Sequence, residues 1–242
     1  MRIRFSLNAS LKHCYTHVVS LKHLKGDEQM EITWLGHSSV CINSRDVILI
    51  TDPFDSSNDK LMPSRKADII TVSNSNSKYS TTTAVDGNPY IVTGPGEYEI
   101  GKHYITGTGT ALSGSSDPKP AINTVYVIRV EGLVIGQLGG LTQKLSSPQL
   151  DQLRQVNILL APIANSCSLE YETLQEIISA IQPRILIPLE YIEEPDESGQ
   201  TGLDKFLSNI GSTETVGINK LNIDETKLPA ELKVQILNPQ NS

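Results

Sequence analysis

Cysteine is scarce in this 242-residue chain, and long hydrophobic runs are absent from it. The three cysteines, Cys14, Cys41 and Cys167, are too few and too scattered for a disulfide framework or a cysteine-based zinc site, so we expect a protein of the reducing cytoplasm. No apolar run approaches the ~20 residues that a membrane span needs, which excludes an integral membrane protein. A net charge of −7 argues against a protein that binds nucleic acid by neutralising its phosphates.

Histidine is also rare, and its five positions are unevenly placed. His13, His17 and His23 fall in the first 29 residues, which leaves His37 and His103 in the remaining chain. Imidazole is a common metal ligand, so the region after residue 29 has few of the side chains from which a zinc site is built.

The first 29 residues differ in charge from the rest. They carry five Lys or Arg and two Asp or Glu, a balance of +3 in a chain whose total is −7. They have no continuous apolar core and no A-x-A cleavage site, so a secretory signal is not expected. We interpret 1–29 as a basic N-terminal extension, either disordered or placed before the true start at Met30, because codons for 25–27 can spell a ribosome-binding sequence. We expect 30–242 to form a single domain.

The hydrophobic pattern predicts that strands come first and helices arrive late. The predicted strands are 31–35, 39–43, 47–51, 68–73, 90–93, 102–110, 123–130, 133–138, 157–161, 185–188 and 233–237. Helices are predicted at 149–155, at 202–210 and in the segment that Pro183 ends, where apolar residues recur at i, i+3, i+4 and i+7. This order favours an α/β architecture of two sheets with helices outside them.

Several motifs match a known family in order and spacing. They lie at 32–39 (Ile-Thr-Trp-Leu-Gly-His-Ser-Ser), 51–54 (Thr-Asp-Pro-Phe), 67–73 (Ala-Asp-Ile-Ile-Thr-Val-Ser), 94–99, 123–126, 187–191 and 228–232. On these residues the chain resembles metallo-β-lactamase-fold hydrolases over 30–238, in the branch of L-ascorbate-6-phosphate lactonase-like, Zn-dependent proteins. The resemblance implies an αβ/βα four-layer sandwich, in which helices flank two mixed β-sheets and strand-end loops form the cleft.

The motifs that supply metal ligands in this family are altered here. Where the family carries H-x-H-x-D-H, 74–79 reads Asn-Ser-Asn-Ser-Lys-Tyr, and its H-L-G-D-L-G-H reads Gln-Leu-Gly-Gly-Leu-Thr-Gln at 137–143. The histidine of its P-x-H-Y motif is also replaced. The residues at the ligand-motif positions are Asn74, Asn76, Lys78, Tyr79, Gly140, Gln143 and Glu190. Neutral amides are weak zinc ligands and an ammonium repels a dication, so we predict no metal and no cofactor.

Three further residues are expected around this degenerate cleft. His37 is predicted to hydrogen-bond behind the ligand positions rather than to catalyse. Asp52 is predicted to cap a turn or to bond to Asn74 or Asn76. Glu97 follows a Gly-Pro-Gly turn, and its carboxylate either faces the cleft or lies on a plain strand surface.

We also predict an ion pair between Lys78 and Glu190. In the resemblance, Lys78 stands at a carboxylate position and Glu190 at a histidine position, so the two charges change together. An ion pair there avoids leaving a bare charge in a vacated polar site, although a buried pair often barely repays its desolvation. The alternative is two unrelated surface charges.

The loss of every motif ligand favours a catalytically inactive member of this fold with a binding, scaffold or regulatory role. The alternative is a residual Mg²⁺- or Mn²⁺-dependent hydrolase acting on a small ester, lactone or phosphodiester. A third hypothesis is a non-metal enzyme built on Lys78, Tyr79 or a nearby serine. We expect a small molecule or a protein as partner, no nucleic acid and no membrane; an oligomer stays open.

Overall fold

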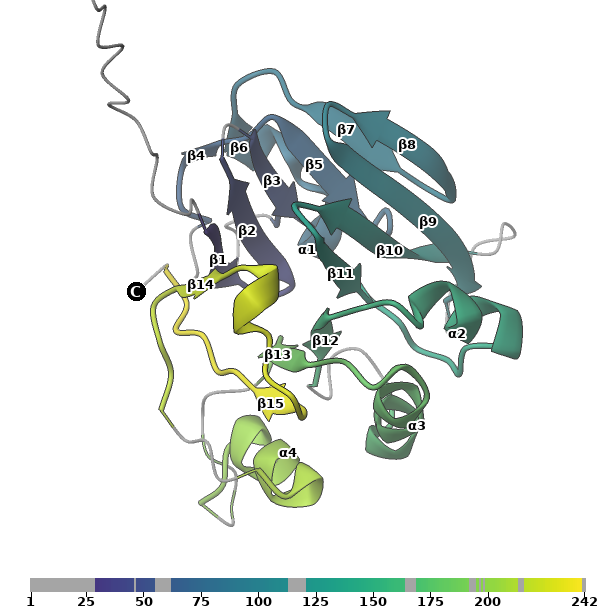
Figure 1. Ribbon diagram of the computed structural model, residues 1–242, viewed down its shortest axis with the longest axis vertical. Helices are drawn as coiled ribbons and strands as arrows, with labels where there is room; N and C mark the ends of the chain where they lie inside the picture. Colours follow the sequence, from purple (N-terminus) through teal and green to yellow (C-terminus); the bar gives the residue numbers. More distant parts are fainter. Residues whose placement is uncertain are drawn as a thin grey trace, which may run out of the picture.

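Two β-sheets pack face to face in this protein, and helices gather along one of them (Figure 1). The computed structural model describes residues 29–45, 47–54, 62–112, 121–163, 169–191, 195, 197, 199–212 and 216–240. The predictions for 1–28, with their three histidines and Cys14, lie outside the described residues, as does Cys167.

The first sheet has six strands in the order β14-β1-β2-β3-β5-β7. β1 (Met30–Gly36), β2 (Ser39–Ser44) and β3 (Val47–Thr51) form an antiparallel meander, and β14 (Leu221–Ile223) pairs antiparallel with β1. The strands that follow, β5 (Ile69–Val72) and β7 (Tyr90–Thr93), run parallel to β3. The sheet is therefore mixed, with β7 at one edge.

The second sheet has seven strands in the order β15-β13-β12-β11-β10-β9-β8. Its strands are β8 (Gly96–Ile100), β9 (His103–Ala111), β10 (Ile122–Val130), β11 (Leu133–Gln137), β12 (Ile158–Pro162), β13 (Ile185–Leu189) and β15 (Lys233–Val234). The hairpins from β8 to β11 are antiparallel, whereas β11, β12, β13 and β15 run parallel. Every residue of β12 and β13 is buried, as expected for parallel strands covered on both faces.

The helices cover the outer face of this second sheet. α2 (Ser147–Leu153), α3 (Tyr171–Ile181) and α4 (Gly202–Ile210) lie beside β11, β12, β13 and β15 (Figure 1). The buried residues of α3 include all four that the spacing predicts, Leu174, Ile177, Ile178 and Ile181, together with Thr173. They join the cluster that includes Val125, Leu159 and Leu186 from the sheet.

Shorter elements occupy the outer face of the first sheet. A small parallel pair, β4 (Arg65–Lys66) and β6 (Val85–Asp86), lies there with a cluster of buried apolar side chains that includes Phe54, Met62 and Val85. α1 (Ser77–Ser80) and the 3-10 turn η1 (Thr82–Ala84) connect β5 to β6, and a second 3-10 turn, η2 (Glu225–Lys227), follows β14.

The two sets of parallel strands end at a common edge. Asp52 follows β3, Ser73 follows β5, and Leu138 follows β11. These ends touch: the Thr124 amide of β10 donates a hydrogen bond to the Ser73 carbonyl (2.7 Å). Side chains in the loops after β3, β5, β11 and β13 are thereby brought together, which is the usual place for a site in such a sheet.

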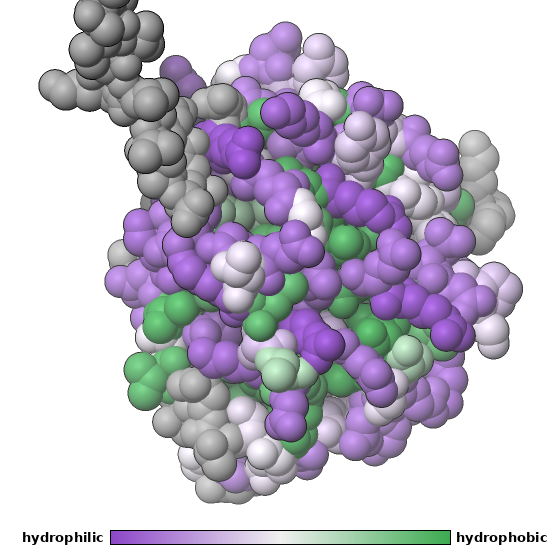
Figure 2. Space-filling model, viewed as in Figure 1, coloured by the Kyte–Doolittle hydropathy of each residue, from purple (hydrophilic) through white to green (hydrophobic). Residues whose placement is uncertain are grey.

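The predicted fold class, an α/β sandwich of two mixed sheets with flanking helices, is confirmed. The sequence pattern missed β8 and β14, because Gly-Glu-Tyr-Glu-Ile and Leu-Asn-Ile are short and mostly exposed or half-buried. No helix among the described residues is long and apolar enough to cross a membrane. The face drawn in Figure 2 is largely hydrophilic, with hydrophobic residues in small patches between polar ones.

Candidate functional site

Two asparagines shape the turn that follows β5. Asn74 Oδ1 accepts a hydrogen bond from the Asn76 amide (3.1 Å), and Asn76 Oδ1 accepts one from the Lys78 amide (3.0 Å). Asn76 is thereby the N-cap of α1. Asn74 is buried and its Nδ2 donates to Ser73 Oγ, whereas Asn76 is exposed. Both amide oxygens therefore hold the local backbone.

Tyr79 and Glu190 meet at the strand-end edge. Tyr79 is the buried residue of α1, and its hydroxyl donates a hydrogen bond to Glu190 Oε2 (3.2 Å). Glu190 directly follows β13 and is half-buried. Its φ of 58° lies in the left-handed region, which a non-glycine residue adopts only where the surroundings hold it, and its amide donates to the His37 carbonyl (3.3 Å).

Gly140 makes room for this contact. A Cβ at Gly140 would lie 2.9 Å from Asn74 Nδ2 and 3.2 Å from Tyr79 Cζ. Both separations are closer than side chains normally allow. The structure thus brings Asn74, Tyr79, Gly140 and Glu190 together from three separate loops, and we call these four residues the Tyr79 centre.

The predicted ion pair between Lys78 and Glu190 is wrong. Lys78 is exposed, and within the described residues it forms no ion pair; the Tyr79 hydroxyl bonds to Glu190 instead. Successive residues on a helix point about 100° apart, so the burial of Tyr79 turns its neighbour Lys78 toward solvent.

Two other predicted residues are exposed. Gln143 lies in the loop between β11 and α2. Glu97 lies on the edge strand β8, where it is in register with Thr106 of β9. Neither belongs to the Tyr79 centre.

Asp52 lies fully buried behind the centre. Its Oδ1 accepts a hydrogen bond from the Ser73 amide (2.7 Å), and its Oδ2 accepts one from Gln137 Nε2 (2.7 Å). The predicted bonds to Asn74 or Asn76 are replaced by these two. Burial, helped by the smaller effect of the nearby Glu190 charge, raises the pKa of Asp52 to about 7 against the lowering effect of its two donors.

Gln137 is the residue that the sequence reasoning missed. It ends β11 and is buried. Its Nε2 donates to Asp52, just after β3, and its Oε1 accepts from Thr71 Oγ1 of β5 (2.7 Å), so it joins two neighbouring parts of the other sheet. The available signal was its place as the first residue of the altered 137–143 motif.

His37 is held through both its backbone and its ring. Its carbonyl accepts hydrogen bonds from Trp34 Nε1 (2.8 Å) and from the Glu190 amide, and its ring packs edge-on against Phe54 at 4.6 Å. Its φ of 46° is also left-handed. The residue therefore anchors the start of the Glu190 loop.

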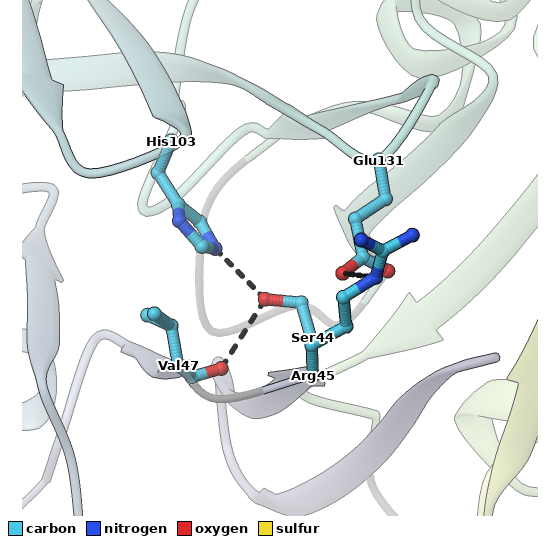
Figure 3. Close-up of polar contacts among 5 residues, drawn as sticks. All are labelled: Ser44, Arg45, Val47, His103 and Glu131. Carbon is cyan, nitrogen blue, oxygen red and sulfur yellow. Dashed lines mark hydrogen bonds and ion pairs between the residues drawn. The ribbon is translucent and has the colours of Figure 1, made fainter. Parts of the chain in front are cut away.

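A serine–histidine contact lies away from this centre. Ser44 Oγ donates to the Val47 carbonyl (3.2 Å) and lies 2.9 Å from His103 Nε2 (Figure 3). When the hydroxyl donates to Val47, the Ser44 oxygen accepts from Nε2–H, and in that tautomer Nε2 cannot act as a general base toward the serine. Both residues are buried, and burial lowers the pKa of His103. The pair links β2 to β9, and the Arg45–Glu131 ion pair (3.2 Å) lies beside it.

Metal-binding side chains do not cluster among the residues that the structure describes. Among the described residues, no three His, Cys, Asp or Glu side chains are grouped so that they could hold a metal ion. At the Tyr79 centre itself, the ionisable groups are one carboxyl, from Glu190, and one phenol.

Comparisons with known proteins agree with this architecture. A proposed Zn-dependent hydrolase of the metallo-β-lactamase superfamily from Thermotoga maritima is 27% identical, with a TM-score of 0.71, over 87% of this chain and 100% of that one. The metallo hydrolase Igni18 from Ignicoccus hospitalis (13% identity, TM-score 0.58, 86% and 95% covered) shares the fold. A proposed metal-dependent hydrolase from Parabacteroides distasonis shares the fold as well. It is 14% identical, with a TM-score of 0.57, over 86% of this chain and 94% of that one.

A family model that matches more than half of the chain shows which family the chain belongs to. No curated protein matches the sequence. The family model of the beta-lactamase superfamily domain matches residues 31–190, which include the Tyr79 centre. On this match and on the shared fold, the chain belongs to the metallo-β-lactamase superfamily.

Proposed function

We propose that this chain is a metallo-β-lactamase-superfamily protein without the family's zinc site, and that it works by binding rather than by metal-dependent hydrolysis. The hydrogen bond from Tyr79 to Glu190 carries the proposal. It joins two of the ligand-motif positions directly, and the tyrosine ring packs against Gly140, a third such position.

The set of donor groups supports this proposal. Zinc in proteins takes imidazole, thiolate and carboxylate ligands, and a catalytic site keeps three of them. Here Asn74 and Asn76 use their amide oxygens on backbone N–H groups, and the Asp52 carboxylate already accepts two hydrogen bonds. Glu190 alone does not make a zinc site, so the residues present do not fit the metal.

We also propose a branch of the superfamily, a class of partner and a location for this chain. We propose that the chain falls in the branch of L-ascorbate-6-phosphate lactonase-like proteins, on the motifs at 32–39, 51–54 and 67–73. We propose a small molecule or a protein as its partner and the cytoplasm as its location. The fold alone does not specify an activity, because activity depends on the site.

Elemental analysis tests the absence of a metal. The full chain, expressed with zinc, magnesium and manganese supplied and then dialysed, should retain less than stoichiometric metal. A variant with six of the family's residues restored serves as the positive control and should retain zinc: Asn74→His, Asn76→His, Lys78→Asp, Tyr79→His, Gly140→Asp and Glu190→His.

The same preparations then answer the question of activity. Wild-type protein should hydrolyse neither a small lactone nor a phosphodiester above the buffer rate with any of the three metals. Stoichiometric metal in the wild type, or hydrolysis that a chelator abolishes, would contradict the proposal and favour the metal-dependent alternative.

A further inference from the structure

A groove of about 800 Å³ opens beside the Tyr79 centre. Its walls come from the carboxyl ends of β5 and β7, the segment of α1 and η1, and the start of β10. Asn74 belongs to both the groove and the Tyr79 centre. This volume is in the range of small-molecule sites, which also favour the carboxyl ends of parallel strands.

The groove has an uncharged lining. Among its thirteen described lining residues there is no Asp, Glu, Lys, Arg or His, although the chain as a whole carries a net charge of −7. A charged ligand would therefore leave water without meeting a compensating charge from these residues, which is costly.

Hydroxyl groups line part of the groove. Ser75, Thr82 and Thr93 line it, and within the described residues their side-chain hydroxyls enter no hydrogen bond. A hydroxyl can both donate and accept, so these three groups can bind either the hydroxyl or the carbonyl of a ligand.

Aliphatic side chains line the groove as well. Ile91 and Ile122 line it with Pro95 and Ala121, and the two isoleucines are 51% and 50% exposed. Ile91 lies on the edge strand β7 and Ile122 at the start of β10. Two large aliphatic side chains half-exposed in one concave site would gain from an apolar group that covers them.

We propose that this groove binds an uncharged, amphiphilic small molecule, whose hydroxyl or amide groups face Ser75, Thr82 and Thr93 and whose aliphatic part covers Ile91 and Ile122. The inference rests on the proposed function, because it gives the binding role a ligand class. The ligand lies beside the Tyr79 centre, with Asn74 between them, and needs neither a metal nor a charged side chain.

Three probes that share one alkyl chain test the charge selectivity. Hexyl β-glucoside is uncharged, hexyl sulfate is an anion, and hexyltrimethylammonium is a cation. In calorimetric titrations of the full chain, the glucoside should bind saturably and at least about tenfold more tightly than either ion, because only the ions lose uncompensated hydration. No saturable binding of the glucoside, or binding of an ion as tightly, would overturn the proposal.

Substitutions then locate the binding. Ile91→Asp places a charge among the aliphatic lining residues and should weaken glucoside binding by about tenfold or more. Tyr104→Asp is the matched control, since Tyr104 is 51% exposed on β9 and lies outside the groove lining. Thermal unfolding of both variants shows that they are folded. Equal affinity of Ile91→Asp and wild type would overturn the proposal.

A hydroxyl deletion keeps the test valid if Ile91→Asp misfolds. Thr82→Val retains the shape of the side chain. It should weaken the binding of hexyl glucoside more than that of hexanol, which has no sugar hydroxyls. An equal effect on both ligands would overturn the proposed contact between the ligand and the lining hydroxyls. Metal content is measured on the same samples. If the protein held stoichiometric zinc and still bound the glucoside, the proposed function would be overturned, whereas the proposal that the groove binds an uncharged ligand would be supported.

Discussion

At the residue scale, the Tyr79 hydroxyl is the group that joins α1 to the end of β13. Tyr79→Phe keeps the ring against Gly140 and removes the hydrogen bond to Glu190. We expect the free energy of unfolding to fall by about 1–2 kcal/mol, the range for a hydrogen bond to a carboxylate that remains half-solvated. Urea titration measures this change.

Tyr90→Phe is the control for that deletion. Tyr90 is 68% exposed on β7, so the loss of its hydroxyl should leave the stability unchanged. Equal free energies of unfolding for Tyr79→Phe and wild type would show that the Tyr79–Glu190 hydrogen bond contributes nothing to folding.

Asp52 gives the protein a distinctive pH dependence. Its pKa is about 7 in the folded protein and 3.8 as the ordinary value, so the folded state binds the proton more tightly. The contribution of Asp52 to stability is full below about pH 3.8 and is lost as the pH rises to about 7, with a slope of up to about 1.4 kcal/mol per unit.

Asp52→Asn removes this titration. The stability advantage of the wild type over the variant should shrink between about pH 4.5 and 7 and stay constant above about pH 8. Urea titrations at several pH values measure the difference. Parallel pH profiles for the two proteins would mean that Asp52 keeps an ordinary pKa.

At the element scale, the turn after β11 packs directly on the turn after β5. A Cβ at Gly139 would lie 2.3 Å from Ser73 Cβ and 2.8 Å from Asn123 Oδ1. Gly139 has a φ of +59°, and Gly101, in the turn between β8 and β9, has a φ of +60° with nothing within 4 Å of its Cβ position. The two glycines therefore share the same left-handed φ and differ in the free space that a Cβ would find.

Alanine substitutions at these two glycines distinguish the cost of backbone strain from the cost of steric overlap. Gly101→Ala should cost about 1 kcal/mol, the strain of a left-handed alanine. Gly139→Ala should cost about 3 kcal/mol or more, because the turns after β5 and β11 must also move apart. Thermal or urea unfolding measures both, and similar costs would contradict the close packing of the two turns.

The elements were largely predictable from the sequence, and the contacts at the site were not. The run Ile-Leu-Leu-Ala-Pro predicts β12, and the apolar spacing in 171–181 predicts α3. Both are local patterns that can be read from a single sequence. That Tyr79 faces inward and Lys78 outward depends on how four residues of α1 sit on the edge of a sheet. The charge pattern alone therefore favoured the wrong partner for Glu190.

Gln137 is a second contact that the local sequence pattern could not predict. Its amide bridges Asp52 and Thr71 across the two sheets, residues 85 and 66 positions away. No local pattern encodes such a bridge. The altered motif at 137–143 pointed to the right segment, but it could not show which residue had become a structural link.

At the scale of the whole molecule, the two sheets are tied by buried polar links as well as by their shared apolar core. Gln137 with Asp52 forms one, and His103 with Ser44 forms another. Burial lowers the pKa of His103, and the charge of Asp68 only partly offsets this by raising it. The two links therefore respond to acid in opposite directions.

His103 should make the protein less stable in acid. A histidine whose pKa is lowered on folding contributes stability that is present above its ordinary pKa of 6.5 and is lost as the pH falls toward the folded value. Protonation would also put a second N–H on a buried ring whose Nδ1 has no partner among the described residues.

His103→Gln removes this titration while keeping an N–H that can reach Ser44. Both proteins are compared in the Asp52→Asn background, where the opposing titration is absent. Between about pH 6.5 and 5, the stability of the protein that retains His103 should fall, whereas that of the His103→Gln variant should stay level. Urea titration at about pH 5 and 7.5 gives the comparison. If the two proteins lost stability equally, the acid sensitivity would have to come from groups outside the link between the two sheets.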